Sequence, residues 1–87
     1  MRYFPASIEV PAGDRLVVEL TNDDASVVHD LALKNDITSD RLYPGESQTV
    51  DFGVITADTD GWCTVGGHRG MGMVVDVTVA GDTQPAP

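Results

Sequence analysis

The chain of 87 residues has few basic residues and a single cysteine. Five Lys and Arg stand against fourteen Asp and Glu, and the net charge of -9 argues against binding to nucleic acid or to an anionic membrane surface. No apolar run approaches the roughly 20 residues of a membrane span. The first residues lack the basic region and apolar stretch of a signal peptide. One cysteine forms no internal disulfide and does not reveal the redox compartment.

Several catalytic motifs are also missing from the sequence. No serine has a nearby histidine in a hydrolase motif, and no phosphate-binding glycine loop is present. The acidic pairs Asp23-Asp24 and Asp58 with Asp60 follow no recognised acid/base spacing, so we expect them to be solvated loop charges. The chain has only two histidines, which limits the metal sites that it can build.

Short apolar runs separated by turn residues are the pattern along the whole chain. Apolar and polar residues alternate with the period of a half-buried strand, and no stretch has a helical period or an internal repeat. The predicted strands cover, in chain order, residues 8–10, 16–20, 27–33, 47–52, 61–65 and 73–79. This pattern predicts one all-β domain, a sandwich or a barrel.

The segment between the last two predicted strands carries three side chains that suit copper. Four residues separate Cys63 from His68, and four more separate His68 from Met73. A thiolate, an imidazole and a thioether are the soft and intermediate ligands that copper prefers. Four glycines over residues 66–72 allow positive φ angles and close backbone approach, so one loop can bring the three side chains together.

A trigonal site of two histidines and a cysteine needs a second histidine, and His29 is the only other one. It lies in an apolar run predicted to be a strand, where a lone histidine is more often a core residue than a ligand. The ligand inventory nevertheless favours His29 as a ligand, because both histidines, the only cysteine and a methionine make one known coordination set with no histidine or cysteine left over. We predict one mononuclear type 1 (blue-copper) site with His29, Cys63, His68 and Met73 as ligands.

Nearly all of the chain resembles the cupredoxins. The resemblance rests on a first strand and turn, a first-histidine segment, a later turn and a ligand loop, which are residues 8–14, 28–31, 43–47 and 61–73. The spacing of His68 and Met73, with Gly72 before the methionine, resembles type 1 sites of multicopper oxidases and copper nitrite reductases. The resemblance implies a cupredoxin-like Greek-key β-sandwich (barrel) with one copper, three equatorial ligands (His29, Cys63 and His68) and Met73 as axial ligand.

Four positions qualify this resemblance. Met71 is a rival axial ligand, at the shorter spacing that some small cupredoxins use. Asp30 stands where many cupredoxins have an Asn that ties the two ligand loops together, so we expect that link to be altered or pH-dependent. Trp62 and Thr64 flank the cysteine, where multicopper oxidases have histidines that lead to a trinuclear cluster. With two histidines in all, the chain is predicted not to be an oxidase or nitrite reductase by itself.

The resemblance implies an electron-transfer domain that passes electrons through the edge of His68, which the glycine loop is expected to leave accessible. Its partner would be a redox protein or an adjacent copper enzyme domain. The alternatives are copper delivery by the same site and a non-redox interaction domain that keeps the fold.

The two ends of the chain suggest a larger parent protein. Residues 2–5 resemble the end of a first cupredoxin strand, and residues 82–87 resemble a Pro-rich interdomain linker. We expect a cupredoxin domain over residues 1–81 with a shortened first strand, cut from a multidomain copper oxidase or nitrite reductase. Such a protein would work in the periplasm, outside the cell or on the outer face of its membrane. An exposed sheet edge allows a monomer or a weak edge-paired oligomer.

Overall fold

Six strands and a short 3-10 helix make up the regular structure of residues 2–80, which the computed structural model describes. They are, in chain order, β1 (Ser7–Pro11), β2 (Asp14–Thr21), β3 (Ala32–Leu33), β4 (Ser47–Ile55), β5 (Thr59–Trp62), the 3-10 helix (Arg69–Met71) and β6 (Val74–Ala80). Within residues 2–80, no helix is long and apolar enough to span a membrane. The predicted linker, residues 82–87, lies outside the described residues.

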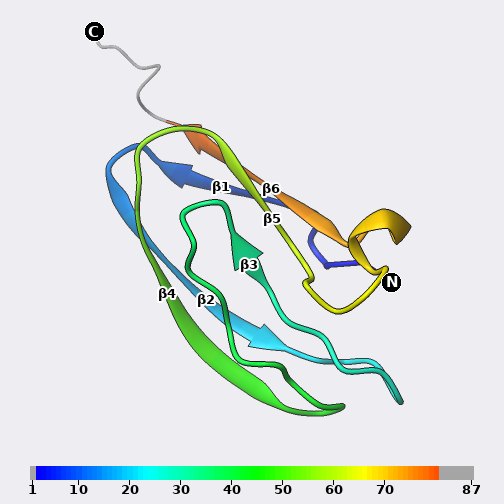
Figure 1. Ribbon diagram of the computed structural model, residues 1–87. Coiled ribbons are helices and arrows are strands. Elements are labelled where there is room, and N and C mark those ends of the chain that lie inside the picture. The colour runs from blue at the N-terminus through cyan, green and yellow to red at the C-terminus, as the bar shows by residue number, and fades with distance from the viewer. Residues whose placement is uncertain (1, 81–87) are drawn as a thin grey trace, which may run out of the picture.

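The strands form two sheets (Figure 1). One sheet has the order β1-β6-β5-β3, with β1 parallel to β6 and the other pairs antiparallel. The second sheet is the antiparallel pair of β2 and β4. The prediction of an all-β sandwich is confirmed, although the two sheets do not close into a barrel within residues 2–80.

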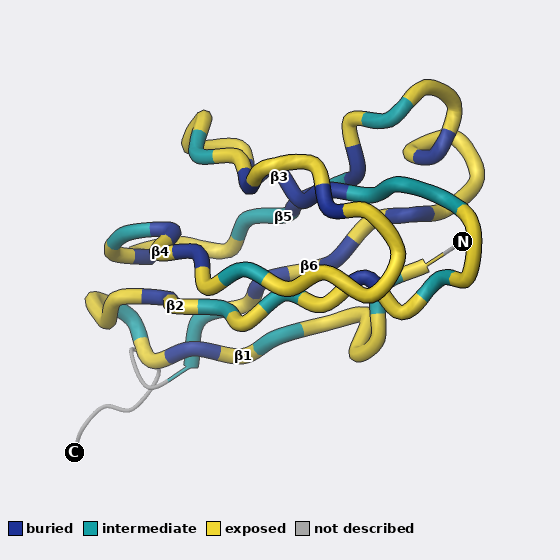
Figure 2. Tube along the Cα trace, turned by 90° about the horizontal axis from the view of Figure 1, so that it is seen from below, coloured by how far each residue is buried: buried dark blue, intermediate teal, exposed yellow. Residues whose placement is uncertain are grey.

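Apolar side chains from both sheets fill one core, and Figure 2 shows buried stretches on strands of each sheet. Alternation along β6 places Val75 and Val77 inside, in the same core as Phe52 of β4, which is fully buried. Close to Gly53, which has a φ of 79°, the alternation of buried and exposed residues along β4 skips a residue. Ile55 is therefore buried, and β4 continues three residues beyond the strand predicted over 47–52.

The strand predicted over residues 27–33 is wrong for most of its length. Only Ala32–Leu33 are in a strand, and His29 forms an isolated bridge with Leu42. In this segment a side chain provides a hydrogen bond that a neighbouring strand would otherwise make: the Asn22 amide donates to the Val27 carbonyl. The β-branched residues of this run favour a strand locally, but the tertiary hydrogen bonds fix an irregular path.

The N-terminal residues also differ from expectation. Residues 2–5 form no strand, although they resemble the end of one, and β1 begins at Ser7. Tyr3 packs against the core, and its hydroxyl donates to the Asp30 carbonyl. This contact holds the N-terminal segment beside the end of the sandwich that carries the loop between β5 and β6 (Figure 1).

Candidate metal centre

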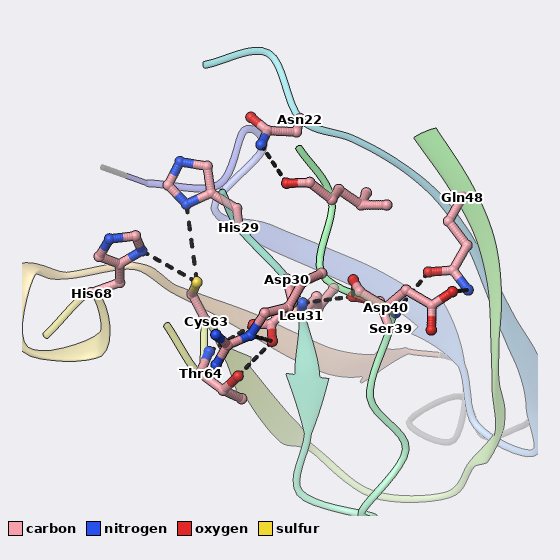
Figure 3. Close-up of polar contacts among 12 residues, drawn as sticks. Asn22, His29, Asp30, Leu31, Ser39, Asp40, Gln48, Cys63, Thr64 and His68 are labelled. Atoms are coloured by element: carbon pink, nitrogen blue, oxygen red, sulfur yellow. Dashed lines mark hydrogen bonds and ion pairs between the residues drawn. The ribbon is translucent and has the colours of Figure 1, made fainter. Parts of the chain in front are cut away.

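Three of the four predicted ligands meet at one end of the sandwich. In Figure 3 the rings of His29 and His68 converge on the Cys63 sulfur from two different segments. Cys63 Sγ lies 3.4 Å from His68 Nδ1 and 4.0 Å from His29 Nδ1. The three potential ligand atoms all lie within 4.8 Å of one another. Residues 34 positions apart in the sequence are thus brought into one cluster.

These separations fit a metal held between the three atoms. First-row metals bind imidazole nitrogen at about 2.0 Å and thiolate sulfur at about 2.3 Å. Two such bonds at a trigonal angle place nitrogen and sulfur roughly 3.7 Å apart, by the geometry of those bond lengths. The two observed sulfur–nitrogen distances, 3.4 and 4.0 Å, lie on either side of that value. Two imidazoles and one thiolate are also the trigonal donor set of blue-copper sites.

The loop from Cys63 to Met73 is closed by its own backbone. Cys63 N–H donates to the Met73 carbonyl at 3.2 Å, and Met73 N–H donates to the His68 carbonyl at 3.1 Å. Gly72, with a φ of 92°, ends the 3-10 helix and turns the chain into β6. The thiol and the imidazole therefore face each other because local hydrogen bonds fix the loop.

The two candidate axial methionines lie in different environments. Met73 is only 4 % exposed, whereas Met71 is 62 % exposed on the 3-10 helix. A weak axial thioether must lie inside the site, so burial favours Met73 over Met71.

His68 is less accessible than the glycine-rich loop predicts. It is 6 % exposed, because its ring turns inward toward Cys63, which is 1 % exposed. Burial raises the pKa of the Cys63 thiol. A metal must displace the thiol proton to gain a thiolate ligand.

The segment that carries His29 is held by distant parts of the chain. His29 N–H donates to the Leu42 carbonyl at 3.0 Å, and Leu42 N–H donates back at 2.7 Å. On the far side of the ring from the cluster, His29 Nε2 lies 3.1 Å from Asp24 Oδ2. Asp24 lies in a loop and is partly exposed, as expected, but its carboxylate also contacts the His29 ring.

Asp30 links the two ligand segments directly. Its Oδ1 accepts the Thr64 N–H at 2.7 Å and its Oδ2 accepts the Thr64 hydroxyl (Figure 3). Arg41 Nε lies 3.7 Å from Oδ2. The carboxylate is buried. The link expected to be altered by an aspartate is therefore present, with Arg41 as a nearby counter-charge.

Three further features border the cluster, and the sequence gives no clear sign of them. The guanidinium of Arg69 lies 4.2 Å from the centroid of the Trp62 ring, next to Cys63 in the chain. Burial raises the pKa of Tyr3, and the proximity of Cys63 adds to the shift. A groove of about 590 Å³ runs between this N-terminal segment and β2 and reaches His29 and Met73.

No protein-family model and no curated protein sequence matches the chain. Solved structures do match. Dithionite-reduced auracyanin from the photosynthetic bacterium Roseiflexus castenholzii superposes with a TM-score of 0.82 at 21 % identity, over 91 % of this chain and 87 % of that one. Auracyanin B gives a TM-score of 0.80 at 20 % identity, over 91 % and 80 %.

A multicopper oxidase, mgLAC, also matches, with a TM-score of 0.70 and 26 % identity. The match covers 93 % of this chain but 30 % of the oxidase. Auracyanin is a cupredoxin. The chain therefore has the cupredoxin fold, and its cluster of His29, Cys63 and His68 fits a single type 1 copper.

Proposed function

We propose that the chain is a mononuclear type 1 copper domain that transfers electrons. His29, Cys63 and His68 would be its equatorial ligands, and Met73 its weak axial ligand. The observation that carries this proposal is the convergence of a buried thiol and one nitrogen of each imidazole within 4.8 Å. The burial of Met73 and the exposure of Met71 support the choice of axial ligand.

The residues around the site suit a redox centre that keeps its geometry. Bound copper would supply a one-electron couple between Cu(I) and Cu(II). The protein's part is to hold the ligands, through the backbone bonds that close the 63–73 loop and through the Asp30 link to Thr64. Electrons would pass through the small exposed part of His68, close in the chain to the exposed Met71 side chain.

Copper titration of the metal-free protein tests the proposal. We expect intense visible absorption and a narrow copper hyperfine splitting in electron paramagnetic resonance, both lost in Cys63→Ser. Met71→Leu is the matched control and should keep both signals. A copper-loaded wild-type protein without colour would contradict the type 1 assignment. Rapid loss of copper to a competing chelator, with no reversible redox couple, would favour copper delivery instead.

We further propose that the domain works beside another copper enzyme domain or a separate redox protein, outside the cytoplasm. The likeness to part of a multicopper oxidase supports the first arrangement, and the likeness to the auracyanins supports the second. With two histidines in the sequence, the chain has no ligands left for a trinuclear cluster. Reduction of oxygen or nitrite would therefore need another domain. The complete open reading frame tests the multidomain arrangement.

A further inference from the structure

The ring of His29 makes contacts on both sides, and only one of them points to the metal cluster. Nδ1 faces Cys63 Sγ at 4.0 Å, while Nε2 lies 3.1 Å from Asp24 Oδ2. An ionised carboxylate can only accept hydrogen bonds. His29 Nε2 must therefore carry a hydrogen, and in the neutral ring the lone pair is on Nδ1, directed at the cluster.

The loop holds the Asp24 carboxylate in this position. Ser26 N–H donates to Asp24 Oδ1 at 3.0 Å, which leaves Oδ2 for His29. Asp24 N–H donates to the Asn22 side-chain oxygen at 2.9 Å. The Asn22 amide in turn donates to the carbonyls of Val27 and Leu42, at 2.8 and 2.7 Å. Asn22, which Figure 3 shows near His29, is buried, so this network is anchored in the body of the domain.

We propose that Asp24 is a positioning residue for the metal centre. It fixes the tautomer of His29 and makes Nδ1 of that ring a stronger electron-pair donor to the metal. This inference rests on the proposed function. A carboxylate hydrogen-bonded to the remote nitrogen of a ligand histidine orients the ring and raises its basicity. A more basic imidazole stabilises Cu(II) more than Cu(I), so Asp24 lowers the reduction potential of the site.

The other imidazole provides an internal contrast. His68 faces Cys63 at 3.4 Å through Nδ1, and within residues 2–80 no carboxylate is found in hydrogen-bond contact with its ring. Asp24 therefore distinguishes the two histidines electronically. The side chains of His29 and Asp24 are 12 % and 28 % exposed, so solvent only partly screens their interaction.

An asparagine at position 24 gives the sharpest test. Ser26 N–H needs an oxygen acceptor, so in Asp24→Asn the new amide oxygen is expected to stay on Ser26, with the NH₂ group facing His29 Nε2. That nitrogen must then accept, and the ring hydrogen moves to Nδ1. Asp24→Ala removes the partner without imposing either tautomer. Asp23→Asn is the matched control, because it removes the same charge from the adjacent, exposed position.

The first measurement uses metal-free protein, so its outcome does not depend on copper binding. Long-range ¹H–¹⁵N spectra of the histidine rings should show His29 protonated on Nε2 in the wild type and in Asp23→Asn. They should show protonation on Nδ1 in Asp24→Asn. A wild-type His29 protonated on Nδ1, or an Asp24→Asn ring unchanged from wild type, would overturn the proposal even if the protein binds copper well.

The second measurement is the reduction potential of the copper-loaded protein. Loss of an outer partner of a metal ligand weakens metal binding by roughly 10- to 100-fold. If Asp24→Ala loses about tenfold more Cu(II) than Cu(I) affinity, the potential rises by about 59 mV. Asp23→Asn should shift it much less. Equal shifts of the potential in Asp24→Ala and Asp23→Asn would mean that Asp24 acts only through its charge, and would contradict its positioning role.

Discussion

The two segments that carry the candidate ligands are held in opposite ways. The loop from Cys63 to Met73 is closed by bonds among its own residues, such as Cys63 N–H to the Met73 carbonyl. The segment around His29 is instead held by a pair of backbone hydrogen bonds to Leu42, which lies outside that segment. One half of the site is thus preformed by local structure, and the other half exists only when the sandwich is assembled.

This difference shows which changes would disrupt the site. A change inside the 63–73 loop alters the ligands but leaves the sandwich standing. A change at the junction between the two segments separates His29 from Cys63 and destabilises the fold as well. The junction has two components: the Asp30 carboxylate on Thr64, and the close approach of β3 to β5 at Gly61.

Removal of the Asp30 carboxylate should have the largest effect on this junction. Asp30→Ala leaves the Thr64 N–H and hydroxyl without their partner and Arg41 without its ion pair. We expect the free energy of unfolding to fall by about 3 kcal/mol, since loss of a buried charged acceptor lies at the upper end of such costs. Urea denaturation of the metal-free protein measures it.

Asp30→Asn is the control for that variant. It keeps an oxygen for the Thr64 N–H and has the residue found at this position in many cupredoxins. We expect it to retain most of the stability lost in Asp30→Ala. Equal losses in both variants would mean that the charge, rather than the hydrogen bond between the ligand segments, holds the junction.

A methyl group at Gly61 should have the next largest effect. A Cβ there would lie 2.8 Å from the Ala32 carbonyl oxygen and 2.8 Å from Leu33 Cδ1. The backbone oxygen cannot turn away as a side chain can, so β3 must move from β5. We expect Gly61→Ala to cost about 2 kcal/mol, as over-packing of a core does. Gly66→Ala is the control, because a Cβ there meets nothing within 4 Å.

The contrast between the segments also explains what the sequence could predict. Cys63 and His68 were predictable because their spacing lies within one loop, and local bonds close that loop. The path of the chain around His29 was not, because the apolar run over residues 27–33 has strand propensity. Buried Asn22 and Ser39 take the backbone bonds that a strand would need. The all-β architecture was predictable from alternation, which β4 interrupts near Gly53.

Replacement of the two methionines compares the inside and the surface of the 63–73 loop. Met73→Leu nearly conserves volume, so we expect it to cost at most about 1 kcal/mol of stability. It should nevertheless raise the reduction potential and shift the visible spectrum of the copper-loaded protein, because the proposed axial thioether is lost. Met71→Leu, at an exposed position, should change neither. A spectral shift in Met71→Leu alone would make Met71 the axial ligand.

The smallest effect is expected far from both ligand segments, on the sheet of β2 and β4. The Gly53 N–H, and then Arg15, lower the pKa of Asp51 below its usual range. A depressed carboxyl pKa stabilises the fold above the unfolded pKa of about 4, and that contribution disappears as the pH falls through the lower folded value. The melting temperature of the wild type should therefore slightly exceed that of Asp51→Asn at pH 7, and the gap should shrink as the pH falls below about 4 and close below the lowered folded pKa.

The exposure of the Arg15–Asp51 pair keeps this effect small. The melting curves of the wild type and of Asp51→Asn also separate the acid sensitivity due to Asp51 from that due to the rest of the chain. Acid sensitivity that persists unchanged in Asp51→Asn must come from other titratable groups of the chain. A difference in melting temperature that widens as the pH falls would exclude a stabilising role for the ionised Asp51.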